Sequence, residues 1–190
     1  LDEWNYVLKW SGGAWTYSRQ VESGRFIQKG TAFAAAMMAA CQEAPVDKAM
    51  YYDTRAYGGM NMLFDPVANR AMKGYYPFFA WGKMAGDYGT QVKATVNDPG
   101  KDGQLFVTAA KDPHGRLAVW IARYSDDDND HEWRTVKVRL PDGMTGGRTT
   151  CHLTDDRHTH TEIALDGDKD GACVLTLVPN AFALLEFEGR

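Results

Sequence analysis

Four adjacent residues near the start of the chain, Asp2-Glu3-Trp4-Asn5, combine carboxylates, an aromatic ring and an amide. A carboxylate at the carboxyl end of a parallel strand lies where barrel enzymes place their catalytic groups. The indole ring of Trp4 offers an apolar face for a sugar ring, and the amide of Asn5 offers a partner for a hydroxyl group. A glutamate beside a tryptophan is also an ordinary solvated strand end, so the spacing alone leaves both interpretations open.

A second group of candidate residues lies at the end of the segment 47–53 and on the loop that follows it. Asp53 either lines a sugar subsite or caps the next turn through its side chain. Tyr51 and Tyr52 alternate, so we expect one to face a barrel interior and the other to face a helix layer. Arg55 lies on the following loop, where it either reaches a ligand or is simply solvated.

The first half of the chain predicts alternating strands and helices that would position these residues. Its aromatic, Met-rich and Ala-rich composition extends to about residue 89. The order strand, helix, strand, helix is typical of parallel-sheet units. We expect a strand over 1–7, a helix over 32–43 that Thr31 caps, a strand over 47–53 and a helix over 73–86.

The second half predicts antiparallel sheet. Apolar and polar residues alternate with a period of two, and short turns such as Pro141-Asp142-Gly143 interrupt them. We therefore place a domain boundary at 89/90, with a barrel-like segment over 1–89 and a β-sandwich over 90–190. The expected strands are 105–109, 117–124, 134–140, 161–165, 174–178 and 183–188, of which 117–124 is apolar on both faces and should be central.

Several motifs together resemble a known group of enzymes. They are LDEWNYV, GTAFAAAMMAACQ, AMYYDTR, GGMNMLFDP and KGYYPFFAWGKM. The chain resembles the C-terminal portion of clan A glycoside hydrolases, particularly family 39 (β-xylosidase-like), and its DEWN motif is also similar to that of family 51 α-L-arabinofuranosidases. The resemblance implies an α/β plus all-β protein: the last two β/α units of a (β/α)8 barrel followed by an antiparallel β-sandwich.

The same resemblance implies a retaining hydrolase acting on β-xylosides or related pentosides. It makes Glu3, at the end of the seventh barrel strand, the catalytic nucleophile. The family's acid/base glutamate follows an asparagine on the fourth strand, and this chain has no Asn-Glu dipeptide. With the carbohydrate substrate in place, the residues expected to contact it are Trp4, Asn5, Tyr52, Asp53 and Arg55.

The length bears on this interpretation, because a complete barrel needs about 250 residues and the chain has 190. We therefore expect the partner of this chain to be an upstream barrel segment, either missing here or supplied as a separate chain. We expect the 190 residues to be inactive alone. The alternative is a non-catalytic carbohydrate-binding or structural β-sandwich accessory module.

Composition argues against other classes of function. The balance of 21 basic and 25 acidic residues argues against nucleic acid as a partner. The longest apolar run, 32–41, is shorter than the roughly 20 residues of a membrane span, so no membrane partner is expected. We expect no cofactor and no metal: the segment 166–171 matches half of a calcium loop, but Leu177 stands where its last ligand should be.

Overall fold

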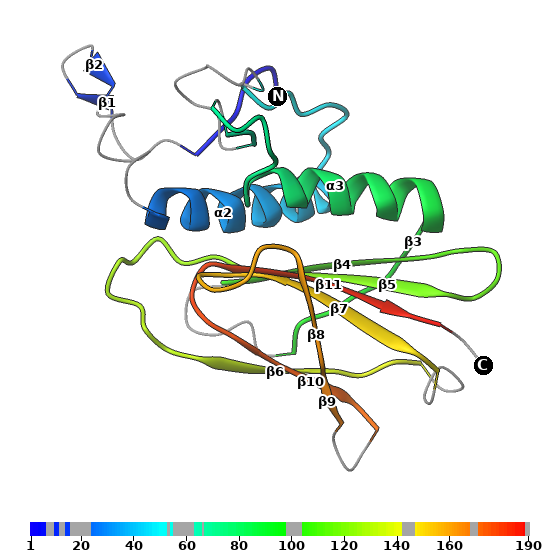
Figure 1. Ribbon diagram of the computed structural model, residues 1–190. Helices are drawn as coiled ribbons and strands as arrows, with labels where there is room; N and C mark the ends of the chain where they lie inside the picture. Colours follow the sequence, from blue (N-terminus) through cyan, green and yellow to red (C-terminus); the bar gives the residue numbers. More distant parts are fainter. Residues whose placement is uncertain are drawn as a thin grey trace.

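Three layers make up the described part of the chain (Figure 1). Helices α2 and α3 lie over one face of a six-stranded sheet, and a three-stranded sheet lies against the other face. Antiparallel strands predominate and helices are few. The computed structural model describes residues 1–6, 10–11, 14–15, 24–52, 54, 63–65, 67–97, 104–141, 147–167 and 171–188.

Both expected helices are present, with different ends. Helix α2 spans Gly24–Glu43, so the expected start at Thr31 is wrong. The Thr31 hydroxyl donates to the carbonyl oxygen of Ile27 one turn earlier, at 2.5 Å, inside the helix. Helix α3 spans Tyr75–Lys83 and continues into a π-helical turn, η1, over Met84–Tyr88. Gly89 ends this turn with a φ of 69°, a left-handed conformation that glycine adopts without steric cost.

The six strands expected in the second half are all present, and the structure adds others. Strands β3, β7 and β9 were not expected, and neither was the short pair β1 and β2. The strands are β1 (Trp10–Ser11), β2 (Ala14–Trp15), β3 (Thr90–Val92), β4 (Leu105–Lys111), β5 (Leu117–Arg123), β6 (Arg134–Val138), β7 (Thr149–Thr154), β8 (Thr161–Ile163), β9 (Asp166–Gly167), β10 (Cys173–Leu177) and β11 (Ala181–Phe187).

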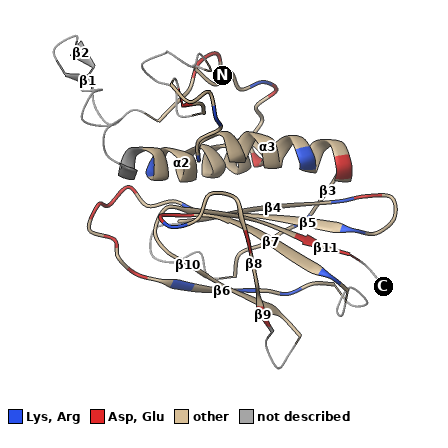
Figure 2. Ribbon diagram, viewed as in Figure 1, with Lys and Arg blue, Asp and Glu red and all other residues tan. Residues whose placement is uncertain are grey.

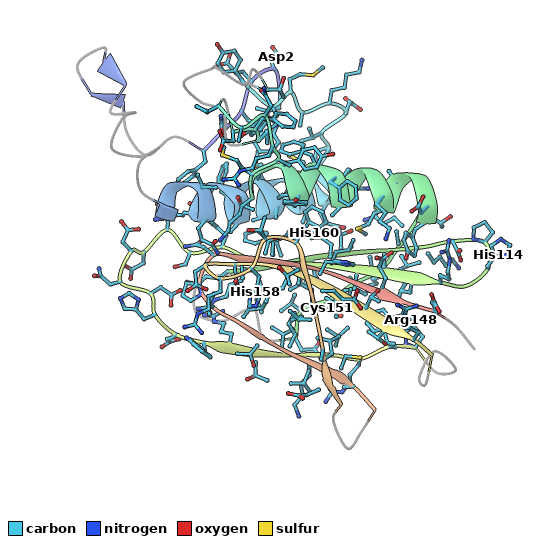
Figure 3. All side chains as sticks on the ribbon, in the orientation of Figure 1. Asp2, His114, Arg148, Cys151, His158 and His160 are labelled. Carbon is cyan, nitrogen blue, oxygen red and sulfur yellow. The ribbon has the colours of Figure 1, made fainter. Side chains whose placement is uncertain are left out.

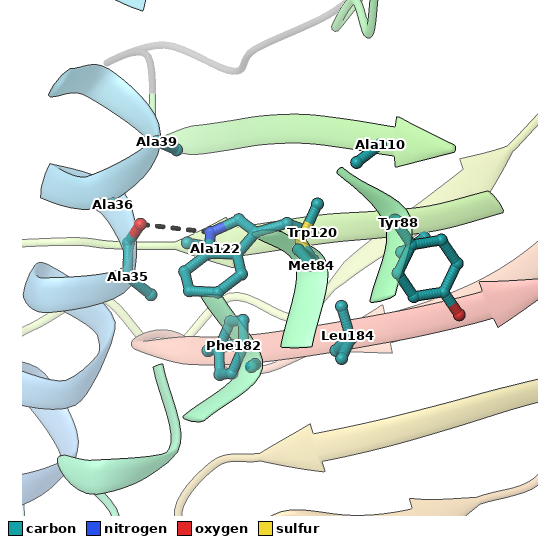
Figure 4. Close-up of a cluster of buried hydrophobic side chains, with 12 residues drawn as sticks. Ala35, Ala36, Ala39, Met84, Tyr88, Ala110, Trp120, Ala122, Phe182 and Leu184 are labelled. Carbon is teal, nitrogen blue, oxygen red and sulfur yellow. Dashed lines mark hydrogen bonds between the residues drawn. The ribbon is translucent and has the colours of Figure 1, made fainter. Parts of the chain in front are cut away.

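The large sheet has the order β3-β4-β5-β11-β7-β8, with β5 and β11 at its centre, and the small sheet has the order β6-β10-β9. Every residue of β5 is buried, as its apolar sequence predicts. Successive side chains of a strand point to opposite faces of the sheet, and Trp120 of β5 lies on the face that packs against the helices. Its Nε1–H donates to the carbonyl oxygen of Ala35 in α2, at 3.2 Å (Figure 4).

Small residues let the helices approach this face of the sheet closely. Ala35, Ala36 and Ala39 of α2 lie beside Ala122 of β5, and larger side chains fill the remaining space (Figure 4). Ala118 of β5 belongs to the same cluster. The larger members of this helix–sheet core are Met84, Tyr88, Trp120, Phe182 and Leu184.

A second core lies between the two sheets, where Ile121, Leu185 and Phe187 meet Leu175 and Leu177 of β10. Two cysteines, Cys151 of β7 and Cys173 of β10, also belong to this core. All three cysteines of the chain are free thiols. Burial raises the pKa of the Cys151 thiol to about 12, which keeps it protonated and unreactive.

The two strands expected in the first half are reduced, over their described residues 1–6 and 47–52, to one parallel bridge between Trp4 and Tyr51. No helix within the described ranges is long and apolar enough to cross a membrane.

Candidate functional site

Backbone hydrogen bonds hold the Glu3 segment parallel to residues 50–52. The Trp4 amide donates to the carbonyl oxygen of Met50 at 3.0 Å, and the Tyr52 amide donates to the carbonyl oxygen of Trp4 at 2.9 Å. The Met50 amide in turn donates to the carbonyl oxygen of Leu1 at 3.0 Å. A parallel pairing of these two segments is the arrangement expected of neighbouring strands in a β/α unit.

The pairing is irregular at Asp2 and Glu3. In a regular parallel ladder, the two residues that bond to one partner are two positions apart. Leu1 and Trp4, which both bond to Met50, are three positions apart. One extra residue is therefore accommodated at Asp2-Glu3, as in a β-bulge, a feature that is enriched beside active sites because it redirects a side chain. Glu3 is exposed.

Trp4 packs against other aromatic residues. It is 9% exposed, and its ring lies 5.1 Å from Tyr51, 6.3 Å from Phe78 of α3 and 6.5 Å from Phe33 of α2. Strand alternation turns Trp4, together with Tyr51, toward the helices, so a sugar contact of Trp4, which stays a prediction, would need the part of its ring that these neighbours leave exposed.

Tyr52 lies on the opposite face of this strand pair. Tyr52 is 39% exposed, and alternation places it on the side away from Tyr51 and the helices. This settles which of the two tyrosines faces the helix layer. Asn5 lies on the same side as Tyr52, since its neighbours Trp4 and Tyr6 are buried toward α2.

The side chain of Asn5 bonds to the backbone. Its Nδ2 donates to the carbonyl oxygen of Tyr52 at 2.5 Å, and its Oδ1 accepts the Tyr6 amide at 2.6 Å. This amide therefore links the two segments beside the Trp4–Tyr51 bridge. Of the other predicted contacts, Asp53 and Arg55 lie outside the described residues.

A polar cluster that the sequence did not indicate lies between α3 and the large sheet. The carboxylate of Glu186 in β11 accepts bonds from Lys83 Nζ and from the Tyr88 hydroxyl, each at 2.6 Å. Burial alone would raise the pKa of this carboxyl, but these two donors outweigh burial and lower it. Lys83 and Tyr88 thus both find their hydrogen-bond partner in Glu186, as expected of a contact with a structural role.

A histidine, His160, lies between the helices and the large sheet (Figure 3). The ring of His160 stacks between Tyr76, at 4.8 Å, and His152, at 4.5 Å. The described residues include no group of three or more side chains able to hold a metal ion. Sequence spacing did not reveal this stack, because Tyr76 comes from α3 and the two histidines come from β7 and from the turn that follows it.

Comparison with solved structures gives fold relatives of the whole chain. A glycoside hydrolase family 30 subfamily 8 xylanase from Clostridium acetobutylicum covers 100% of this chain with a TM-score of 0.68 and 11% identity. A family 30 endoxylanase from Clostridium papyrosolvens covers 100% with a TM-score of 0.65 and 11% identity. A family 44 xyloglucanase from Paenibacillus polymyxa covers 87% with a TM-score of 0.57 and 13% identity.

The chain accounts for 42%, 41% and 30% of those three structures, respectively. No family model matches the sequence, and no curated protein matches it. At these identities the likeness is one of fold. These three solved structures that share the fold belong to glycoside hydrolase families 30 and 44, and family 39 is not among them.

Proposed function

We propose that this chain is part of a retaining glycoside hydrolase and that Glu3 is its nucleophile. Residues 1–89 would supply the last two β/α units of the barrel, and residues 90–190 the β-sandwich beside it. One observation carries the proposal: Glu3 is exposed at an irregularity of a parallel strand pair whose other face packs on α2 and α3. The surrounding fold is shared along its whole length with two xylanases.

In the proposed reaction a Glu3 carboxylate oxygen bonds to the anomeric carbon while the bond from that carbon to the leaving-group oxygen breaks. A second carboxylic acid gives its proton to the leaving oxygen, and it later takes a proton from the water that releases the sugar. The two carboxyl groups must be about 5–5.5 Å apart. The acid would come from an upstream barrel segment, in the same polypeptide or in a separate chain.

The substrate class we propose is β-xylosides or related pentosides. Tyr52 is exposed and Trp4 is buried, so we assign the main aromatic contact with the sugar to Tyr52. Asp53 and Arg55 follow it in the chain and remain candidates for the same subsite. Asn5 is assigned to holding the two segments in register, because its amide bonds to the backbone on both sides.

The test uses the product of the whole reading frame and an aryl β-xyloside with a good leaving group. Glu3→Ala should lower kcat at least about a thousandfold, as loss of a nucleophile does. Added azide should then restore turnover and give the α-glycosyl azide, since azide attacks from the side that the carboxylate has vacated. Asp2→Asn, the neighbouring carboxylate, is the matched control and should keep its activity. Turnover that survives Glu3→Ala would contradict the assignment.

The accessory-module alternative is tested with the 190-residue chain. Calorimetry with xylan oligosaccharides should show little binding, because only part of the barrel is present. Firm sugar binding, together with no turnover by the whole reading-frame product, would favour a carbohydrate-binding module instead. If the 190-residue chain does not bind sugar and the whole reading-frame product does not turn over the substrate, a structural module would be favoured.

A further inference from the structure

An aromatic contact joins the Glu3 segment to the large sheet. Tyr6 is 5% exposed, and its ring lies 5.4 Å from Phe33 of α2 and 6.4 Å from Tyr124. Phe33 and Tyr124 are themselves 5.5 Å apart, so the three rings touch one another. Tyr124 directly follows β5, and Tyr6 comes three residues after Glu3. A residue of the sheet is thereby in contact with the end of the strand that carries the proposed nucleophile.

Tyr124 is fixed at both ends. Its amide donates to the carbonyl oxygen of Gln104 at 2.9 Å, beside the start of β4. Its hydroxyl donates to Asp126 Oδ1 at 3.0 Å, and the Tyr6 hydroxyl lies 3.5 Å from the same oxygen. Burial, with the nearby Asp126 carboxylate, raises the pKa of both tyrosines. Both hydroxyls therefore keep their protons and act as donors at neutral pH.

The loop after Tyr124 is fastened to the first turns of α2. The Lys29 side chain is 7% exposed, and its Nζ lies 3.1 Å from Asp126 Oδ1 and 2.9 Å from Asp128 Oδ1. It also donates to the carbonyl oxygen of Asp126 at 2.6 Å. Burial alone would lower the pKa of Lys29, but the two carboxylates outweigh burial and raise it. Figure 2 shows this acidic loop beside the start of α2.

We propose that Tyr124, held in place by Asp126, is a positioning residue for the strand that carries Glu3. This inference rests on the proposed function for its catalytic consequence. Backbone hydrogen bonds join residues 1–4 to residues 50–52, and ring contacts add to them. Glu3 itself is exposed, whereas its neighbours Trp4 and Tyr6 are buried, so the rings packed on Trp4 and Tyr6 help to place the strand. A misplacement of about 1 Å in a reacting group costs about a hundredfold in rate.

The first test measures hydrogen exchange in the 190-residue chain by NMR. Its readouts are the Trp4 and Tyr52 amides, which bond across the strand pair. Tyr124→Ala should speed their exchange about tenfold or more, because local opening becomes easier. The matched control is Tyr88→Ala, which likewise removes a tyrosine that packs in the helix–sheet region and donates to a carboxylate, but one that lies at the other end of β5. After allowance for any change in global stability, Tyr88→Ala should leave the exchange rates of the Trp4 and Tyr52 amides unchanged.

Equal acceleration in both variants, or none in Tyr124→Ala, would overturn the positioning role. Tyr124→Phe keeps the ring contacts and loses the bond to Asp126, so its effect should be smaller than that of Tyr124→Ala. An effect of Tyr124→Phe as large as that of Tyr124→Ala would show that the hydroxyl, and not the ring, transmits the order.

The second test measures catalysis in the product of the whole reading frame. Tyr124→Ala should lower kcat about ten- to a hundredfold and change KM less than twofold, because the nucleophile is displaced while the sugar subsite remains. An unchanged kcat with faster exchange would overturn the catalytic consequence. Should Glu3→Ala leave turnover intact, the proposed function fails, while the exchange result still decides the positioning of the strand.

Discussion

His160 shows how packing sets the charge of a single side chain. Burial, together with the nearby His152 and Lys83, lowers the pKa of its imidazole to about 4, against a smaller opposing effect of Glu186. Its ring stacks on Tyr76 of α3 and stands edge-on to Phe79 at 5.4 Å. Protonation of His160 therefore places a positive charge between α3 and the sheet, where Lys83 already carries one.

The consequence is a loss of stability in acid. The unfolded chain takes up this proton near pH 6.5 and the folded chain only near pH 4, so the folded state weakens as the pH falls through that range. One pKa unit corresponds to about 1.4 kcal/mol, and since the ring is partly exposed we expect a loss of about 2 kcal/mol. His160→Phe keeps an aromatic stack and should flatten the pH dependence in urea unfolding. The same change at exposed His114 should not.

At the scale of elements, the strand pair near the N-terminus depends on the two helices. Trp4 contacts Phe33 of α2, Phe78 of α3 and Tyr51 of the neighbouring segment. Among the residues that the structure places, its Nε1–H has no acceptor. Trp4 therefore contributes to stability through the packing of its ring, which contacts both helices.

Trp4→Ala should accordingly lower the free energy of unfolding by about 3 kcal/mol, the usual cost of removing a buried aromatic residue. Urea denaturation followed by circular dichroism measures it. Trp133→Ala is the control, because Trp133 is 65% exposed and exposed substitutions usually change stability by less than about 0.5 kcal/mol. A stable Trp4→Ala protein with reduced sugar affinity would instead support the predicted sugar contact of Trp4.

Sequence patterns predicted the elements better than their ends. The apolar strand β5 and the Ala-rich body of α2 were predicted because hydrophobic residues repeat at the period of each element. Strand β7 was missed because its sequence TTCHLT is short and largely polar, although Cys151 and Leu153 alternate inward. The first turns of α2 were missed because Gln28 and Lys29 find their polar partners on distant loops.

The candidate site was predictable only in part, for a similar reason. Motif resemblance drew attention to Glu3 and its neighbours, but a motif does not say which side of a strand faces the helices. The orientation of Trp4 depends on Phe33 and Phe78, which lie 29 and 74 positions further along the sequence. Tyr6 and Tyr124 are even further apart in the sequence, so the spacing of neighbouring residues could not predict their contact.

At the scale of the whole molecule, the large sheet is buried on both faces. The helix–sheet core joins Ala35, Ala80 and Met84 from before residue 89 to Trp120 and Leu184 from after it. Polar contacts reinforce it, since Lys83 bonds to Glu186 and Lys73 bonds to the carbonyl oxygens of Asp155 and Asp156. Neither half can separate without exposing this core to water.

We therefore expect the chain to unfold in one cooperative step. Tryptophan fluorescence and far-ultraviolet circular dichroism should give the same urea midpoint. Residues 90–190 produced alone should bind a hydrophobic dye and aggregate, because the helix-facing side of β5 and β11 would be bare. Two separated transitions in the whole chain, or a soluble and folded 90–190 fragment, would show that the expected boundary at 89/90 divides independent domains.

The free thiols provide a chemical probe for opening of the core between the two sheets. Cys41 and Cys173 are half-buried, whereas Cys151 is fully enclosed between the two sheets. A colorimetric thiol reagent should modify the half-buried sulfurs first, and Cys151 only when the two sheets part. The rate of the slow phase then reports how often the two sheets separate, and no label has to be introduced.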